Sequence, residues 1–181
     1  MRKVVYSVAM SLDGYVAGPN GEADWITMDT DPEDPEFDFA AWAARFDTVL
    51  IGRKTYEQVK AMGGGEPMPG VASIIASRTL KPEDCPGATV IGDGLTDRVR
   101  GLRAGSGKDI WLFGGGVLFR SLLDAGLVDE VSVAVMPVLL GGGVPLVAAG
   151  NRAKLRLTGN KSYKSGAVSL EYAVETDRAK G

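Results

Sequence analysis

Three successive glycines separate an apolar segment of the chain from a segment with helical spacing. The apolar segment is Ile110–Phe113, the glycines are Gly114, Gly115 and Gly116, and the helical spacing covers residues 117–125. Glycine has no Cβ atom, so a ligand can approach this part of the backbone closely. A helix that begins here presents unpaired N–H groups and the positive end of its dipole, which suits a phosphate or diphosphate group. The spacing matches neither the dinucleotide-binding motif nor the P-loop, and the alternative is a tight strand-to-helix corner without a ligand.

Two further polar groups follow apolar segments in the same way, namely Gly52-Arg53-Lys54-Thr55 and Ser77-Arg78. The first group combines two cations, a hydroxyl group and the start of a helix, which together suit a terminal phosphate. Taken singly, each group is more typical of a solvated surface. In an open α/β sheet, however, ligands bind at the carboxyl ends of strands, and all three groups fall there. The sequence therefore predicts a phosphate-containing ligand where the three groups meet.

Strands and helices alternate along most of the chain, and only strands are expected near its end. The expected strands are residues 4–10, 48–51, 71–76, 89–91, 109–113, 128–135, 154–163 and 167–175, and the expected helices are residues 37–46, 54–62, 95–103 and 117–125. This order predicts an α/β fold with a twisted, mostly parallel central sheet, flanking helices and a C-terminal antiparallel hairpin. No long linker or internal repeat interrupts it, so one domain spanning residues 1–181 is expected.

Composition excludes several classes of function. The chain has 181 residues, no histidine and a single cysteine, Cys85. These counts exclude Ser-His-Asp and Cys-His catalysis, histidine-ligated zinc and an internal disulfide, so no metal site is expected. A net charge of −3 gives no reason to expect nucleic acid or a membrane as a partner. With neither a signal peptide nor a long apolar segment, the chain is expected in the cytoplasm.

Several short motifs occur in the order found in one known superfamily. They are Ser11–Gly14, Ile51–Glu57, Ser77-Arg78, Trp111–Leu118, Gly126–Glu130, Pro137 and Leu140–Gly143. In this order they resemble the dihydrofolate reductase-like superfamily, which includes dihydrofolate reductases and the reductase domain of bifunctional riboflavin-biosynthesis deaminase–reductases. The chain resembles a stand-alone member related to that reductase domain, because it has no histidine and cysteine set with which to build a zinc deaminase.

The resemblance implies NADPH as the hydride donor. It places Ala9, Val16 and Ala17 beside the nicotinamide. The residues that it assigns to the diphosphate and its surroundings are Phe113, Gly114, Gly115, Gly116, Val117 and Leu118. Those that it assigns to the adenosine end and the 2′-phosphate are Gly52, Arg53, Lys54, Thr55, Ser77 and Arg78. An arginine pair suits a phosphate dianion better than a bare ribose hydroxyl, which favours NADPH over NADH.

The proton donor and the substrate pocket are less closely defined. Dihydrofolate reductases carry one acidic residue on the first helix, and here Glu36 and Asp38 lie near that place. Asp38 is the better candidate because its neighbours are apolar, a setting that raises the pKa of a carboxyl group. The alternative is that Asp38 only complements the helix dipole, in which case water is the proton source. Trp25 is expected either to cap the substrate pocket or to hold its loop in place, and Tyr56 either to line the pocket or to pack in the core.

The resulting hypothesis is an NADPH-dependent reductase that transfers hydride to a small heterocyclic acceptor, pterin- or pyrimidine-like, or to a related compound. The alternative is a non-catalytic NADP-binding sensor or scaffold. A homodimer is expected by resemblance. The apolar residues 131–140 are expected to contribute to it, because exposed β-rich edges tend to be paired or covered.

Overall fold

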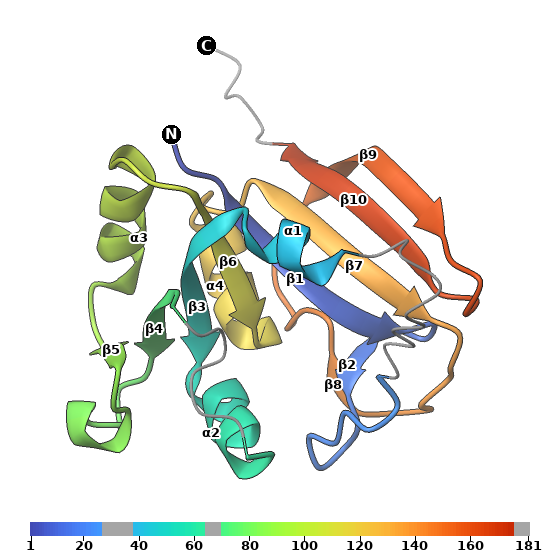
Figure 1. Ribbon diagram of the computed structural model, residues 1–181, viewed down its shortest axis with the longest axis horizontal. Helices are drawn as coiled ribbons and strands as arrows, with labels where there is room; N and C mark the ends of the chain where they lie inside the picture. The colour runs from blue at the N-terminus through green and yellow to red at the C-terminus, as the bar shows by residue number, and fades with distance from the viewer. Residues whose placement is uncertain (27–37, 64–69, 176–181) are drawn as a thin grey trace.

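A large twisted sheet organises the computed structural model, which describes residues 1–26, 38–63 and 70–175 (Figure 1). The strands are β1 (Val4–Ser11), β2 (Tyr15–Ala17), β3 (Phe46–Gly52), β4 (Ala72–Ala76), β5 (Ala88–Ile91), β6 (Asp109–Gly114), β7 (Glu130–Met136), β8 (Val144–Pro145), β9 (Lys154–Ser162) and β10 (Val168–Glu175). The helices are α1 (Phe39–Ala43), α2 (Arg53–Ala61), α3 (Leu95–Ala104) and α4 (Gly116–Asp124), with a 3-10 turn at Pro82–Asp84. The strands and helices expected from sequence are present, although α1 is shorter than residues 37–46.

The eight-stranded sheet has the order β5-β4-β3-β6-β1-β7-β10-β9. Neighbouring strands from β5 to β7 run parallel, whereas β10 pairs antiparallel with both β7 and β9. The predicted α/β fold with a C-terminal antiparallel hairpin is therefore confirmed. Strand β6 lies between β1 and β3, so the carboxyl ends of these three strands meet near the centre of the sheet, where ligands bind in such folds.

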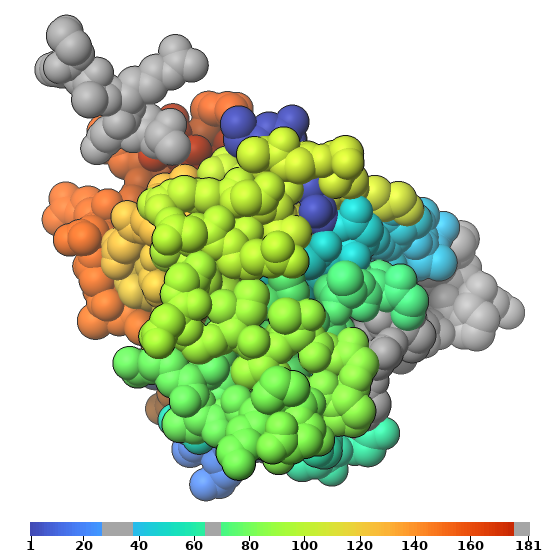
Figure 2. Space-filling view, turned by 90° about the vertical axis from the view of Figure 1, so that its left-hand side faces the viewer, coloured from blue at the N-terminus to red at the C-terminus, as the bar shows by residue number. Residues whose placement is uncertain are grey.

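Each face of the sheet buries its own apolar core, because successive side chains of a strand point to opposite faces. On one face, α3 and α4 cover a core that includes Tyr6 and Leu112, both with no measurable exposure. The Tyr6 ring stacks on Phe119 of α4 with centroids 3.9 Å apart. On the other face, α1 and α2 lie over a smaller core that includes Ile51 and Trp111. The β5 edge lies at the side shown in Figure 2, where the segment that carries β5 and α3 dominates the surface.

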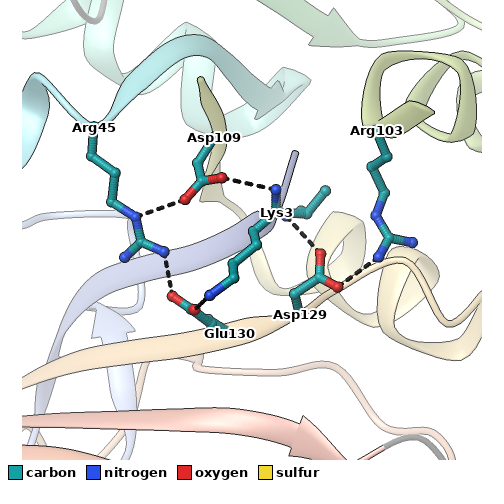
Figure 3. Close-up of polar contacts among 7 residues, drawn as sticks. Lys3, Arg45, Arg103, Asp109, Asp129 and Glu130 are labelled. Atoms are coloured by element: carbon teal, nitrogen blue, oxygen red, sulfur yellow. Dashed lines mark hydrogen bonds and ion pairs between the residues drawn. The ribbon is translucent and has the colours of Figure 1, made fainter. Parts of the chain in front are cut away.

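Charged residues join the amino ends of the central parallel strands (Figure 3). The Arg45 guanidinium before β3 donates to Asp109 of β6 at 2.8 Å and to Glu130 of β7 at 2.5 Å. Lys3, just before β1, donates to Glu130 at 2.6 Å. Arg103 of α3 forms an ion pair with Asp129 at 2.6 Å. This network holds four strands together at the end of the sheet opposite to the carboxyl ends.

Two features differ from the sequence analysis. The strand part of the segment 131–140 is not a sheet edge, because β7 pairs with β1 on one side and with β10 on the other. The reason given for its part in a dimer was therefore wrong, and the homodimer itself stays a prediction. A short antiparallel pair of β2 with β8 was not expected. Within the described ranges, no helix is both long and apolar enough to cross a bilayer.

Candidate functional site

A cleft of about 2350 Å³ opens at the carboxyl ends of the parallel strands. Sites for drug-sized ligands occupy roughly 300–1,000 Å³, so this cleft has room for a dinucleotide and a second small molecule. All residues that the sequence analysis assigned to the cofactor line it: Ala9, Val16, Ala17, Gly52, Arg53, Lys54, Thr55, Ser77, Arg78, Phe113, Gly114, Gly115, Gly116, Val117 and Leu118. Groups that lie far apart in the sequence therefore share one cleft.

The glycine triplet forms the corner between β6 and α4. Strand β6 ends at Gly114, whose φ of +140° strongly favours glycine, and Gly115 is the N-cap of α4. Among the described residues no side chain caps this helix, and its first turn contains no acidic residue. Its first N–H groups and the positive end of its dipole are therefore available to an anion. The corner has the backbone geometry and polarity that a diphosphate requires.

A second corner joins β3 to α2. Gly52 is the N-cap of α2, again without a side-chain cap or an acidic residue in the first turn. The Arg53 side chain is 44% exposed and lies 3.9 Å from the Glu57 carboxylate. Lys54 and Arg78 are exposed, and neither side chain forms a hydrogen bond or ion pair with another described residue. All three cations line the cleft, and several charged donors of this kind can hold a phosphate dianion.

Ser77 shapes the turn that carries Arg78. Its side chain is buried, and its hydroxyl accepts hydrogen bonds from the backbone N–H groups of Thr79 at 3.2 Å and Leu80 at 2.9 Å. Such bonds are typical of serine in turns. Ser77 therefore has a positioning role in addition to its place in the cleft lining.

Small side chains lie where the resemblance places the nicotinamide. Ala9 of β1 and Ala17 of β2 line the cleft, and β2 pairs with β8 through Ala17 and Val144. The preceding loop is held by Asp13, which accepts hydrogen bonds from the Ser11 hydroxyl and from the backbone N–H of Gly141. The Ser11 hydroxyl holds the pKa of Asp13 below its usual value. This carboxylate therefore organises the loops around the cleft.

The candidate proton donor lies outside the cleft lining. Asp38 is exposed and is the N-cap of α1, where its Oδ1 accepts a hydrogen bond from the backbone N–H of Ala41 at 2.8 Å. This contact corresponds to the alternative given above, an acid that stabilises the start of the helix. Glu36 lies outside the described residues.

The two residues expected in the substrate pocket also do not line the cleft. Tyr56 is buried in the core beneath α2, and its hydroxyl lies 3.5 Å from the carbonyl oxygen of Asp84. Its expected place in the pocket was wrong, and packing in the core, the stated alternative, is what the structure shows. Trp25 is half-buried, and its indole N–H donates to the carbonyl oxygen of Glu22 at 3.3 Å, which holds the loop in place.

Sequence reasoning missed the part of the cleft beyond Ala9. One wall there is aromatic: Trp111 makes edge contacts with Trp42 at 4.8 Å and with Phe113 at 4.7 Å between ring centroids. The floor is polar and comes from β1, β7 and β10, with Ser7, Ser132, Ser169 and Glu171 as its polar members. The alternation of apolar and polar residues in the last strands could have shown this polar face.

Comparison with known proteins decides the family. The family model described as the RibD C-terminal domain matches residues 2–169. The chain belongs to the RibD C-terminal domain family. Among curated proteins, an uncharacterized protein of Bacillus subtilis, YyaP, is 31% identical, and the match covers 94% of each chain. The riboflavin biosynthesis protein RibD of Mycobacterium tuberculosis is 30% identical, and the match covers 80% of this chain but 44% of that protein.

Solved structures confirm the dihydrofolate reductase-like fold. A protein of Shewanella sp. PV-4, provisionally assigned to riboflavin biosynthesis, superposes with a TM-score of 0.81 at 26% identity, covering 96% of this chain and 99% of that one. Dihydrofolate reductase from Enterococcus faecalis, solved in complex with NADP(H), superposes with a TM-score of 0.67 at 15% identity, covering 96% and 97%. The second likeness bears on the fold alone. The resemblance inferred from the order of the motifs is therefore confirmed at the level of family and fold.

Proposed function

We propose that this RibD C-terminal domain protein is an NADPH-dependent reductase that acts on a small pterin- or pyrimidine-like heterocycle. One observation carries the proposal. The glycine corner of α4, the cationic corner of α2 and the small residues of β1 and β2 line the same cleft. Their chemistry suits, in turn, a diphosphate, a further phosphate and a flat ring. The names of the M. tuberculosis and E. faecalis proteins add support from family and fold.

In this proposal, different residues bind different parts of NADPH. The first N–H groups of α4 hold the diphosphate, and Arg53, Lys54 and Arg78 hold the 2′-phosphate. Ala9 and Ala17 leave room for the nicotinamide ring because their side chains are short. When bound, NADPH supplies a hydride, two electrons with one proton, to the carbon of a C=N or C=O bond. The heteroatom of that bond takes a proton from water or from a side chain, and Asp38 stays a candidate for this role.

Binding and turnover test the proposal separately. Titration of the purified chain with NADPH and with NADH, followed by calorimetry, should show binding and a preference for NADPH. Oxidation of NADPH is then followed by the loss of absorbance of the reduced nicotinamide, with dihydrofolate and aminopyrimidines as acceptors. NADPH binding without oxidation by any acceptor would favour the sensor or scaffold alternative. If neither nucleotide binds, the proposed function is wrong.

A further inference from the structure

Three polar residues form one row across the floor of the cleft. Ser7 of β1 pairs in register with Ser132 of β7, and Ser132 pairs in register with Glu171 of β10. All three line the cleft, on the face opposite to the apolar core beneath α4. Neighbouring strands lie about 4.8 Å apart, so the row extends over about 10 Å. A flat molecule that lies across these strands can contact all three side chains.

The polar side chains of this row have no partners within the part of the chain that the structure describes. The hydroxyls of Ser7 and Ser132 and the carboxylate of Glu171 form no hydrogen bond or ion pair there. By contrast, the other glutamate of the described cleft lining, Glu57, lies 3.9 Å from the Arg53 guanidinium. Glu171 is therefore the carboxylate of the cleft that is most available to a ligand.

The strand beside Glu171 leaves its carboxylate room to move. Glu171 is in register with Gly159 of β9, and a Cβ atom at Gly159 would come within 2.9 Å of the Glu171 Oε2. The carboxylate therefore occupies the space that a side chain at position 159 would fill. Rotation about its side-chain bonds can carry it from β9 toward Ser132 without the loss of a hydrogen bond or ion pair to a described residue. A ligand on the row can recruit it at little cost.

The row adjoins both the aromatic wall and the expected nicotinamide place. The Trp111 indole N–H donates to the backbone carbonyl oxygen of Ser7 at 3.0 Å, so the edge of the wall meets the end of the row. Ala9 lies two residues further along β1, on the same face and about 7 Å away. A heterocycle that stacks on the wall therefore reaches the row with its polar edge and the nicotinamide place with its other edge.

We infer that Glu171, with Ser132 and Ser7, selects an acceptor whose ring edge carries amino groups. An aminopyrimidine that is protonated at the ring nitrogen beside its amino group offers two adjacent N–H donors, which match the two oxygens of a carboxylate, and the carboxylate favours that protonated form. A carboxylate at the same place disfavours an acceptor with negative charge on that edge. The inference rests on the proposed function, because it takes the adjacent part of the cleft as the nicotinamide site. Glu171 is a specificity residue here, and no proton transfer is assigned to it.

The test measures binding of 2,4-diaminopyrimidine to the full chain by NMR titration, without nucleotide and again with NADPH. Substitution Glu171→Gln should weaken this binding about tenfold or more, because it removes a charged acceptor. Ser132→Ala should weaken it by a smaller factor. Glu175→Gln is the matched control: Glu175 is exposed on the same strand and face but does not line the cleft. It should leave the affinity unchanged.

Uracil is the matched ligand, since it is a pyrimidine of similar size with carbonyl oxygens in place of the two amino groups. Its affinity should not respond to Glu171→Gln. The inference is overturned if 2,4-diaminopyrimidine does not bind the unsubstituted chain, if Glu171→Gln leaves its affinity unchanged, or if both ligands lose affinity equally. Because the titration is also run without nucleotide, failure of NADPH binding would remove the proposed function and still leave this result interpretable. Thermal melting of each variant shows that the fold is intact.

Discussion

The Asp13 carboxylate accepts a hydrogen bond of 2.7 Å from the backbone N–H of Gly141, although the two residues lie on different loops. A second bond of 3.1 Å comes from the N–H of Leu140. One carboxylate thus joins the loop after β1 to the loop after β7. Next to this junction, a Cβ at Gly143 would overlap the carbonyl oxygen of Ala17. The two loops fit closely on one side of the cleft.

Substitution Asp13→Ala should loosen both loops. The hydrogen bonds to Leu140 and Gly141 would be lost, so hydrogen exchange at the Gly141 N–H should accelerate and the melting temperature should fall. The lowered pKa of Asp13 means that its contribution is present at neutral pH and is lost as pH falls through the folded-state pKa. Asp93→Ala is the control, because Asp93 is exposed and forms no hydrogen bond or ion pair among the described residues. Equal exchange rates in both variants would contradict the role of Asp13.

The double substitution Arg53→Ala and Arg78→Ala should weaken NADPH binding about tenfold or more, because two charged donors to a phosphate are removed. NADH lacks the 2′-phosphate, so its affinity should change by no more than about twofold. Calorimetric titration with each nucleotide measures the difference. Arg98→Ala, on the exposed surface of α3, is the control and should affect neither nucleotide. Equal losses for NADPH and NADH would show that these arginines do not read the 2′-phosphate.

Two glycine-to-alanine substitutions in helices should have opposite effects on stability. At Gly116 the added Cβ would lie 2.9 Å from the Pro145 carbonyl oxygen, and this backbone contact should cost about 1–3 kcal/mol. At Gly101 in α3 the Cβ meets nothing within 4 Å, so the substitution should stabilise by about 0.5–1 kcal/mol. Urea unfolding measures both. Gly116→Ala should also weaken NADPH binding, since α4 begins there; Gly101→Ala should not.

The network at the amino ends of the strands should make stability dependent on acid. Burial raises the pKa of Glu130, but hydrogen bonds from Lys3 and Arg45 outweigh it and lower the pKa overall. The balance at Asp109 is similar, with donors from the Lys3 backbone and Arg45. Both carboxylates therefore stabilise the fold above their unfolded-state pKa values, near 4, and this stabilisation is lost as pH falls through the folded-state values.

Glu130→Gln should reduce the free energy of unfolding at pH 7 by about 1–2 kcal/mol, because hydrogen bonds to a charged group are lost. It should also flatten the decrease in stability between about pH 4.5 and pH 3. Urea midpoints measured across this range give both quantities. Glu83→Gln is the control, since the Glu83 side chain is 69% exposed and its ion pair with Lys81 is 3.8 Å long. If stability depends on pH in the same way in both variants, the network is not the cause of that dependence.

The sequence predicted the sheet and the cofactor side of the cleft because their signals are local. Glycine and polar residues directly follow the apolar strands at Gly52, Ser77 and Gly114, and parallel strands place such ends together. Gly114 has a φ of +140°, a conformation that few other residues adopt, so the corner before α4 is recognisable without contacts from elsewhere in the chain.

The remaining features depend on contacts between distant segments. Whether β7 is an edge depends on β10, which pairs with it from the end of the chain. Tyr56 has helical spacing that fits either the cleft or the core, and only the position of Asp84 and the core beneath α2 decides between them. The Ser7–Ser132–Glu171 row exists only through strand register, which no local pattern specifies.

With β6 between β1 and β3, the residues assigned to the nucleotide and those of the polar floor come from different parts of the sheet. Strands β3, β4 and β6 carry the residues assigned to the nucleotide, whereas β7 and β10 carry the polar floor, and β1 contributes to both. In the proposed reductase, substitutions on the antiparallel side can therefore exchange one acceptor for another while the nucleotide preference is inherited unchanged. Relatives with the same glycine corner and a different floor would share the nucleotide site and differ in the acceptor that they reduce.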